Sequence, residues 1–167
     1  TQTFWGYLNK RVTEERIKRG RQMIADHARL LAETERRYGV QARFLVAFWA
    51  LESNFGAYTG TYPAVSAIAT LAFDHRRSAF FREQLLALLQ GMDAGDIPLD
   101  ATGSWAGALG QPQFIPTTYR RHAVDGDGDG RRDLWLSLAD VFASAANYLA
   151  AAGWDGMRTW GREVRLP

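Results

Sequence analysis

The stretch Phe44-Leu-Val-Ala-Phe-Trp-Ala-Leu-Glu-Ser-Asn-Phe-Gly56 decides the fold of this chain. It joins a long apolar run to a single carboxyl group, that of Glu52. Because the run is apolar on most sides, it predicts a helix over residues 41–52 at the centre of the core. The neighbours of Glu52 in the sequence are the apolar residues Phe48, Trp49, Leu51 and Phe55.

Such neighbours would remove part of the hydration of the charged carboxyl group. Lost hydration raises the pKa of a carboxyl group and keeps a proton available near neutral pH. The position of Glu52 therefore suits a general acid. An ordinary ion pair with one of the many arginines is the alternative, because structural ion pairs also perturb carboxyl groups.

The overall composition describes a chain that can bury its own core. It has 167 residues, of which 47% are hydrophobic and 13% aromatic, and is most simply one domain. The formal net charge is only +2, and acidic residues interrupt the basic N-terminal region, which argues against a nucleic-acid partner. The chain has no cysteine, which excludes disulfides, thiolate catalysis and cysteine-based zinc sites.

Capping residues and apolar spacing predict further helices around the central one. One long polar helix should begin after the N-cap Thr13 and end near Gly39. Another should cover residues 79–90, with Ser78 as its N-cap and Gly91 at its end.

The remaining helix predictions follow from the same signals. A short helix is expected over residues 66–73 and another after Pro116. Ser137 should cap a last long helix that ends before Gly153. Strand signals are poor, so the predicted fold class is mainly α, or α+β at most.

The segment Gly103-Ser-Trp-Ala-Gly-Ala-Leu-Gly-Gln-Pro-Gln-Phe-Ile-Pro-Thr-Thr-Tyr119, here called the Gly-rich segment, predicts a carbohydrate site. Its glycines permit close backbone approach, and its side chains supply apolar faces and amide hydrogen bonds. Such a lining suits a sugar chain. The side chains concerned are Trp105, Gln111, Gln113, Phe114 and Tyr119.

Three motifs in order carry a resemblance to a known family. They are Ala50-Leu-Glu-Ser-Asn-Phe-Gly56, Gly107-Ala-Leu-Gly-Gln-Pro-Gln-Phe-Ile-Pro-Thr-Thr-Tyr119 and Ala145-Ala-Asn-Tyr-Leu149. Together they resemble the lytic murein transglycosylases of the B type, the membrane-bound lytic transglycosylase B family. The resemblance implies a lysozyme-like catalytic domain with a cleft between the Glu52 helix and the Gly-rich segment.

A run of alternating carboxylates predicts a calcium site. Asp125-Gly-Asp-Gly-Asp-Gly-Arg-Arg-Asp133 matches the first half of an EF-hand loop, but Leu136 stands at the twelfth position, where a Glu is expected. The resemblance implies a lengthened loop that Asp140 closes. Solvated Asp-Gly turns and an ordinary helix cap are the alternative. The expected ligands of a structural Ca²⁺, with no organic cofactor, are Asp125, Asp127, Asp129, Arg131 and Asp140.

The resemblance also implies a reaction that needs one carboxyl group. Glycosidases usually pair two carboxyl groups about 5–9 Å apart. The motif segments offer no second acid for Glu52, and Asp74 is the one nearby alternative. In similar enzymes the acid protonates the glycosidic oxygen of the β-1,4 bond between N-acetylmuramic acid and N-acetylglucosamine. The muramyl 6-hydroxyl then attacks its own anomeric carbon and loses its proton to the same carboxylate, which leaves a 1,6-anhydro sugar.

Two alternatives to this function stay open. A lysozyme-like or chitinase-like hydrolase would use the same acid and a second carboxylate, for which Asp74 is the candidate. A non-catalytic, calcium-stabilised glycan-binding module would need neither. The resemblance to the transglycosylase family assigns the substrate contacts to Arg76, Arg77, Ser104, Gln113, Phe114, Ile115 and Tyr148.

The resemblance further implies how the chain is organised and where it acts. Residues 1–39 should form a helical arm that packs on a lysozyme-like catalytic core at 40–167, with the EF-hand-like loop at 125–140. Family members extend further at both ends, so part of the groove is expected beyond residue 167. The expected partner is the peptidoglycan glycan strand in the periplasm or cell envelope. We expect a monomer, with peripheral outer-membrane association through segments outside this chain.

Overall fold

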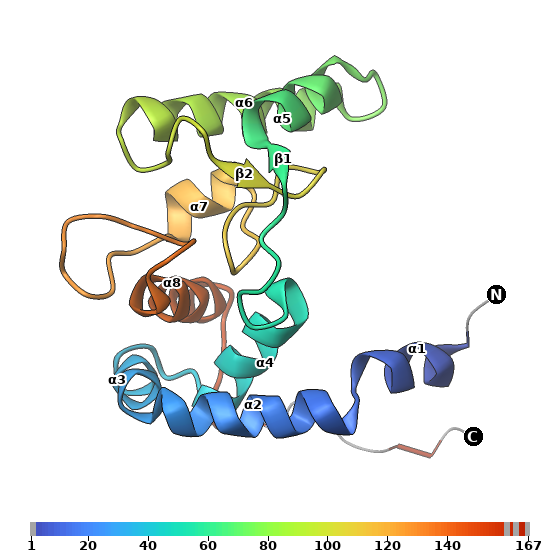
Figure 1. Cartoon of the computed structure of the whole chain (residues 1–167), viewed down its shortest axis with the longest axis vertical. Coiled ribbons are helices and arrows are strands. Elements are labelled where there is room, and N and C mark those ends of the chain that lie inside the picture. The colour runs from blue at the N-terminus through green and yellow to red at the C-terminus, as the bar shows by residue number, and fades with distance from the viewer. Residues whose placement is uncertain (1–2, 159–160, 162–163, 166–167) are drawn as a thin grey trace.

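Helices dominate the computed structural model, which describes residues 3–158, 161 and 164–165 (Figure 1). The prediction of a mainly α fold is confirmed. Within the described residues, no helix combines the length and the apolar character needed to cross a membrane. The elements in chain order are α1 (Phe4–Arg11), α2 (Glu14–Asp26), α3 (Ala28–Tyr38), α4 (Ala42–Ser53), β1 (Tyr62–Pro63), α5 (Ala64–Phe73), α6 (Ser78–Asp93), β2 (Thr102–Gly103), α7 (Pro116–His122) and α8 (Leu138–Ala151).

One core cluster lies where α2, α3, α4 and α8 meet, in the lower half of Figure 1. Its centre is α4, as the apolar run predicts, and α8 packs on the same cluster. Leu31 brings α3 into this core. Aromatic rings fill much of it: Trp49 lies 5.2 Å from Phe142 between ring centroids.

A second core cluster joins α5, α6 and α7 to the Gly-rich segment. Ile68 and Leu88 face Leu109 of that segment, and all three are fully buried. Phe48 on α4 packs against both clusters and so connects the two halves of the molecule.

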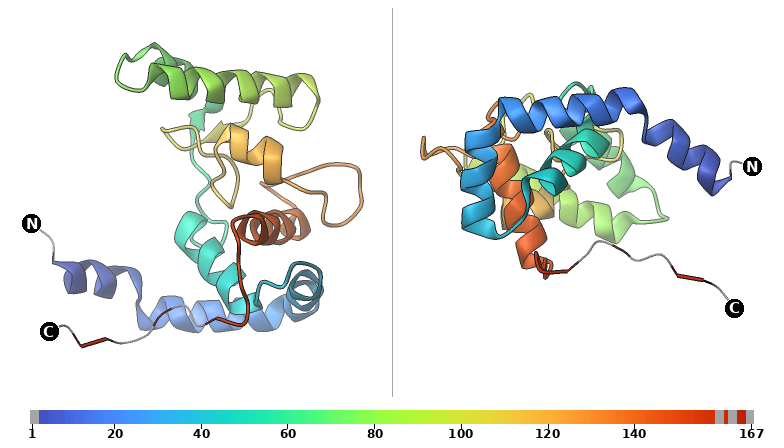
Figure 2. Two further views of the ribbon diagram at one scale, coloured as in Figure 1. Left: turned by 180° about the vertical axis from the view of Figure 1, so that it is seen from behind. Right: turned by 90° about the horizontal axis from the view of Figure 1, so that it is seen from below.

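The predicted single helix from Thr13 to Gly39 is wrong, because His27 divides it into α2 and α3. His27 leaves helical geometry, with φ −111° and ψ 21°. Its ring packs 6.1 Å from the ring of Trp49 and 6.3 Å from that of Phe142. The break turns the chain so that α2 packs on α4 while α3 packs on α8 (Figure 2). Both predicted ends are confirmed, by the Thr13 cap and the left-handed Gly39.

Two further predictions concerned α6 and are wrong. Ser78 does not cap the helix; its hydroxyl group donates to the carbonyl of Ala72 at 2.6 Å, which ties α6 to α5. Gly91 lies inside the helix. A side chain at this position would collide with Ile97. The glycine serves close packing here and does not end the helix.

The N-terminal helix α1 was not predicted from the sequence. Thr3 caps it by accepting a hydrogen bond from the amide of Gly6 at 3.1 Å. None of its residues is buried, so its apolar residues do not follow a core-facing pattern. It projects away from the rest of the molecule in both views of Figure 2. A division of the chain at residue 39 stays a prediction.

The two strands fix the start of the Gly-rich segment. Tyr62 pairs with Gly103 and Pro63 with Thr102 in an antiparallel arrangement. Just before β1, Gly60 has a φ of 96° and lies directly against the backbone of Gly103. A Cβ atom at this position would collide with the carbonyl group of Gly103, so the contact depends on glycine.

This close approach generates a stability prediction. Gly60→Ala should destabilise the domain by clearly more than Gly95→Ala, which has a φ of 77° but open space around its Cα. The control carries only the strain of a left-handed alanine, about 1–2 kcal/mol, whereas Gly60→Ala adds a backbone collision. Urea denaturation of both variants measures the difference, and equal losses would show that the contact does not matter.

Candidate active site

Glu52 lies in the last turn of α4, just before an unusual reversal of the chain. Three consecutive residues, Asn54, Phe55 and Gly56, have left-handed φ values of 52°, 60° and 77°. Asparagine and glycine accept this conformation readily, but phenylalanine does so at a cost. Strained backbone is often found at functional sites, where the surroundings hold it in place. Here it fixes where α4 ends and therefore where Glu52 projects.

Ser53 holds this reversal together from inside. It is buried, its hydroxyl group donates to the carbonyl of Trp49 at 3.2 Å, and its oxygen accepts from the amide of Gly56 at 3.0 Å. These bonds satisfy groups that the end of a helix would otherwise leave unpaired.

The surroundings of Glu52 differ from the enclosed setting that the sequence suggested. Its side chain is exposed, and Leu51 is 58% exposed. Trp49 and Phe55 turn into the core instead, because successive helix residues point in different directions. Even so, partial burial raises the pKa of the Glu52 carboxyl group above its ordinary value of 4.5. The direction expected from the sequence is therefore correct, although the enclosure is incomplete.

Asp74, the candidate second carboxylate, is held by Arg76. The guanidinium group donates to both carboxylate oxygens, with Nη2 to Oδ2 at 2.7 Å, and the backbone amide of Arg76 donates at 2.9 Å. These hydrogen bonds from Arg76 lower the pKa of Asp74 far below its ordinary value. Asp74 is thus ionised and already occupied by a cation, which makes it a poor acid and a weak base.

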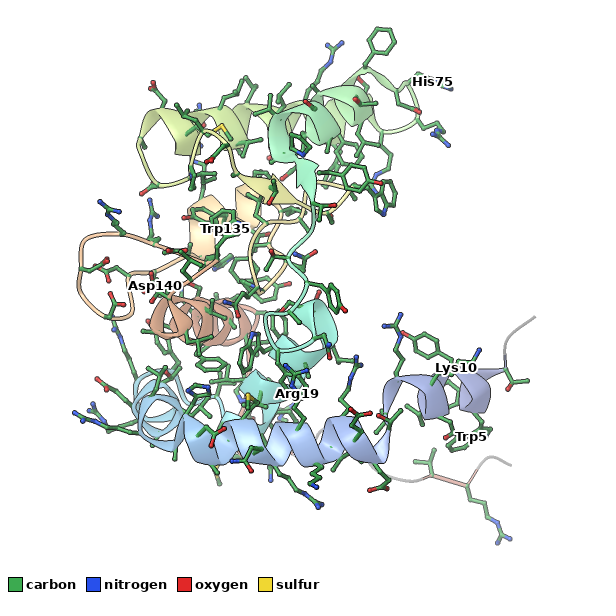
Figure 3. All side chains as sticks on the ribbon, in the orientation of Figure 1. Trp5, Lys10, Arg19, His75, Trp135 and Asp140 are labelled. Atoms are coloured by element: carbon green, nitrogen blue, oxygen red, sulfur yellow. The ribbon has the colours of Figure 1, made fainter. Side chains whose placement is uncertain are left out.

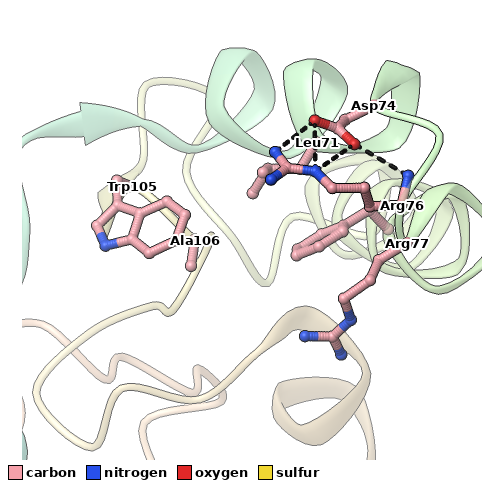
Figure 4. A pocket seen from close by; sticks show the side chains of 7 residues that line it. Leu71, Asp74, Arg76, Arg77, Trp105 and Ala106 are labelled. Carbon is pink, nitrogen blue, oxygen red and sulfur yellow. Dashed lines mark hydrogen bonds and ion pairs between the residues drawn. The ribbon is translucent and has the colours of Figure 1, made fainter.

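A pocket of about 270 Å³ lies beside this pair (Figure 4). Trp105 of the Gly-rich segment faces Arg76 and Asp74 across it, and Glu52 is not among its lining residues. Arg77 also lines the pocket and stacks over Phe80, 4.3 Å from the ring centroid. The other lining residues are Leu71, Phe81 and Ala106. Sequence reasoning missed Leu71 and Phe81, because apolar helical residues are more often core.

Ser104 and Gln113 both serve to shape the Gly-rich segment. The Ser104 oxygen accepts from the amide of Ala108 at 3.0 Å. The Gln113 amide group donates to the carbonyl of Thr59 at 3.2 Å, so it reaches the chain that leaves α4. Gln113 also has a left-handed φ of 52°. Its Oε1 makes no hydrogen bond within the described part of the chain and can accept one from a ligand.

Phe114 and Ile115 belong to this segment and Tyr148 packs on Phe114 from α8, but the three residues differ in exposure. Phe114 is only 3% exposed, which leaves its ring little surface for a ligand. Tyr148 on α8 is half-buried, and its ring lies 5.5 Å from the ring of Phe114 and 5.4 Å from that of His122 between centroids. Ile115 is half-buried at the start of α7. Tyr148 and Ile115 therefore remain available for contact.

The EF-hand-like loop at 125–140, from here on called the acidic loop, gathers part of the predicted calcium set. Carboxylate oxygens of Asp125, Asp127 and Asp140 lie within 4.8 Å of one another. Asp129 is outside this group, and its carboxylate accepts the amide of Arg131 at 2.8 Å. Three hard oxygen ligands at this spacing fit Ca²⁺.

Asp140 connects the acidic loop to the domain. It is fully buried at the start of α8, where the loop rejoins the domain (Figure 3). Its Oδ1 accepts the amide of Gly126 at 2.7 Å, and its Oδ2 accepts the amide of Asp133 at 2.6 Å. The Ser137 oxygen accepts the amide of Asp140, as the predicted cap requires.

The Gly-rich segment connects the separate parts of this region. Near its start, the segment lines the pocket of Arg76 and Arg77 through Trp105. Further along, Gln113 donates a hydrogen bond to Thr59, in the chain that leaves α4. The structure thus brings Gln113, Phe114 and Tyr148 into one neighbourhood and places Arg76 and Arg77 in another. The two neighbourhoods are joined by one continuous stretch of chain, the Gly-rich segment.

Comparison with known proteins identifies the family of this chain. A family model described as "Transglycosylase SLT domain" matches residues 1–167. The chain is 35% identical over 150 residues to membrane-bound lytic murein transglycosylase B of Escherichia coli (strain K12), covering 89% of this chain and 41% of that protein.

Solved structures of similar proteins share the fold. SltB3 from Pseudomonas aeruginosa in complex with NAG-anhNAM-pentapeptide has a TM-score of 0.95 and 48% identity, covering 100% of this chain and 45% of that one. The Escherichia coli lytic transglycosylase Slt35 in complex with calcium has a TM-score of 0.85 and 34% identity, covering 92% of this chain and 49% of that one.

The chain spans less than half the length of these relatives. Within that span, the predicted lysozyme-like fold and the resemblance to B-type enzymes are both confirmed. The chain belongs to the transglycosylase SLT domain family.

Proposed function

We propose that this domain is a lytic transglycosylase that cleaves the β-1,4 bond between N-acetylmuramic acid and N-acetylglucosamine in peptidoglycan. The observation that carries the proposal is the contrast between two carboxyl groups. Partial burial raises the pKa of Glu52, while Arg76 keeps Asp74 ionised. One group suits proton donation and the other is committed to a cation, so a mechanism with a single working carboxyl group fits best.

In this mechanism Glu52 acts first as acid and then as base. Its proton goes to the glycosidic oxygen, and the bond between that oxygen and the muramyl anomeric carbon breaks. The muramyl 6-hydroxyl oxygen forms a new bond to the anomeric carbon and gives its proton to the Glu52 carboxylate. The carboxyl group is restored, the product is a 1,6-anhydromuramyl end, and no water is consumed.

The sugar chain would lie along the Gly-rich segment. Gln113 can accept a hydrogen bond through Oε1, which has no partner among the described residues, and Tyr148 offers a half-buried ring and hydroxyl group beside Phe114. Arg76 and Arg77, with Trp105, would hold a more distant, anionic or polar part of the substrate. Ser104 and Ile115 are the other proposed substrate contacts. Phe114 is buried and would act by packing against the ring of Tyr148.

Asp125, Asp127 and Asp140 would hold a structural Ca²⁺ that neutralises their mutual repulsion. Asp129 and the backbone carbonyl of Arg131 would become further ligands when the ion binds. The complex of the relative SltB3 with NAG-anhNAM-pentapeptide supports the proposed substrate. The complex of the relative Slt35 with calcium supports the proposed ion. We further propose that the protein acts in the periplasm or cell envelope, and that it does so as a monomer.

Substitution of Glu52 tests the catalytic assignment. Glu52→Gln should lower the release of soluble muropeptides from purified peptidoglycan by about 10²–10⁴-fold. Because the raised pKa means that the folded state disfavours the charged form, the same change should leave the melting temperature unchanged or higher. Liquid chromatography of the released fragments and a thermal melt measure both effects.

Asp74→Asn is the matched control, because it also removes one carboxylate. It should retain measurable turnover. A loss as large as that of Glu52→Gln would favour a hydrolase with two carboxyl groups. Unchanged glycan release by Glu52→Gln would end the catalytic proposal.

A pair of loop variants tests the calcium assignment. CaCl₂ should raise the melting temperature of the wild type, and EDTA should reverse this. Asp127→Asn, inside the carboxylate group, should weaken the response, whereas Asp129→Asn, at a residue that is also exposed, should weaken it less. Each tenfold loss of affinity removes about 1.4 kcal/mol of calcium-dependent stability at saturating ion. A wild type that does not respond to calcium would contradict the assignment.

A further inference from the structure

The side chain of Gln111 joins two parts of the molecule that are distant in sequence. It is 7% exposed. The indole Nε1–H of Trp49 on α4 donates to its Oε1 at 2.6 Å. Its own Nε2 donates to the carbonyl of Trp135, beyond the acidic loop, at 2.7 Å.

The chemistry of the two partners fixes the orientation of this amide. An indole nitrogen can only donate and a backbone carbonyl can only accept, so the Gln111 oxygen must face Trp49 and its nitrogen must face Trp135. Neither partner could be satisfied if the amide were flipped. The side chain thus makes one defined bridge, and buried groups of this kind are costly to leave unpaired.

The backbone around Gln111 reinforces the bridge at both ends. The amide of Gln111 donates to the carbonyl of Leu134 at 2.8 Å. On the other side, a Cβ atom at Gly56, in the reversal after Glu52, would collide with the Gln111 side-chain oxygen. The amide therefore fits closely between the end of α4 and the chain that leaves the acidic loop.

A continuous set of hydrogen bonds leads from this bridge to the carboxylate group. The Asp133 carboxylate accepts the amides of Trp135 at 2.8 Å and Leu136 at 2.9 Å. The amide of Asp133 in turn donates to Asp140, one of the three clustered carboxylates. Trp135 and Asp140 are labelled in Figure 3, on the chain that returns from the loop and at the start of α8.

The acidic loop differs chemically with and without a bound cation, and such a connection needs an element with two states. Three carboxylates within 4.8 Å repel one another without a cation and are drawn together by one. A shift of Asp140 on cation binding would move the amide of Asp133, and the bonds above would carry that shift to Gln111 and Trp49. Trp49 lies one helical turn before Glu52.

We propose that Gln111 is a positioning residue that couples cation binding in the acidic loop to the placement of Glu52. It touches neither the cation nor the reacting atoms and acts through Trp49. The assignment of Glu52 as the reacting group rests on the proposed function, whereas the proposed coupling rests on the hydrogen bonds described above. It is measurable without turnover.

Nuclear magnetic resonance of the 167-residue chain tests the coupling directly. CaCl₂ added to the wild type should shift the indole Nε1–H signal of Trp49 and the backbone amide signal of Glu52. Gln111→Met keeps the length of the side chain but removes both hydrogen bonds. It should still bind calcium by calorimetry, while the calcium-induced shift of the Glu52 amide falls severalfold.

Two further variants separate coupling from stability. Gln84→Met is the matched control: Gln84 is 1% exposed and its Oε1 accepts from the amide of Thr117 at 3.1 Å, away from this path. It should keep the full calcium-induced shift at Glu52. Trp49→Phe removes the indole donor while keeping an aromatic ring, so it should lose the shift as Gln111→Met does, and it decides the matter if Gln111→Met does not fold.

Three results would overturn the proposal. They are a wild type whose Glu52 and Trp49 signals ignore calcium, a wild type that binds no calcium, and variants at Gln111 and Trp49 that keep the full shift. Peptidoglycan release by the same samples is measured separately. An inactive wild type with intact coupling would count against the proposed function and leave the coupling standing.

Discussion

The hydrogen bond between the Trp49 indole and the Gln111 amide is the constraint on which the rest of the site depends. Trp49 belongs to the core built on α4, where it packs 5.6 Å from Phe55 and 5.2 Å from Phe142. Gln111 belongs to the Gly-rich segment, which packs on the other core. A single buried polar contact therefore fixes how the helix of Glu52 faces the segment proposed to hold the sugar. Phe48, shared by both cores, adds apolar packing to the same junction.

Glycine makes this junction possible in a way that differs from the expectation drawn from the sequence. The glycines of the Gly-rich segment were expected to let a sugar approach the backbone. At Gly103 and Gly110 the close neighbours are instead other parts of the protein, namely Ala108 and Leu134. Gly60, just before β1, lies directly against the backbone of Gly103, where a side chain would not fit. Internal packing therefore determines the shape of the Gly-rich segment. Only the parts of it that are not packed against the protein can contact a ligand.

The sequence predicted those features that depend on local chemistry. Caps at Thr13 and Ser137 came from hydroxyl side chains that satisfy helix ends, and the acidic loop came from its alternating carboxylates. The break at His27 and the helical Gly91 depend on partners distant in sequence, so no local pattern could reveal them.

The same limit applied to the candidate site. The raised pKa of Glu52 followed from its apolar neighbours, but most of its expected enclosure did not form, because Trp49 and Phe55 turn into the core. The pairing of Asp74 with Arg76 is local and could have been suspected from their spacing. The bridge through Gln111 spans 62 residues on one side and 24 on the other, which leaves no signal in a single sequence.

The central claim is that one carboxyl group cleaves the glycan and that the substrate supplies the nucleophile. Digestion of purified peptidoglycan in H₂¹⁸O, followed by mass spectrometry of the fragments, tests it most directly. The account predicts muramyl ends that lack one water relative to the reducing sugars and carry no ¹⁸O. Reducing ends that carry ¹⁸O would show that water attacks the anomeric carbon, and the proposed mechanism would be wrong.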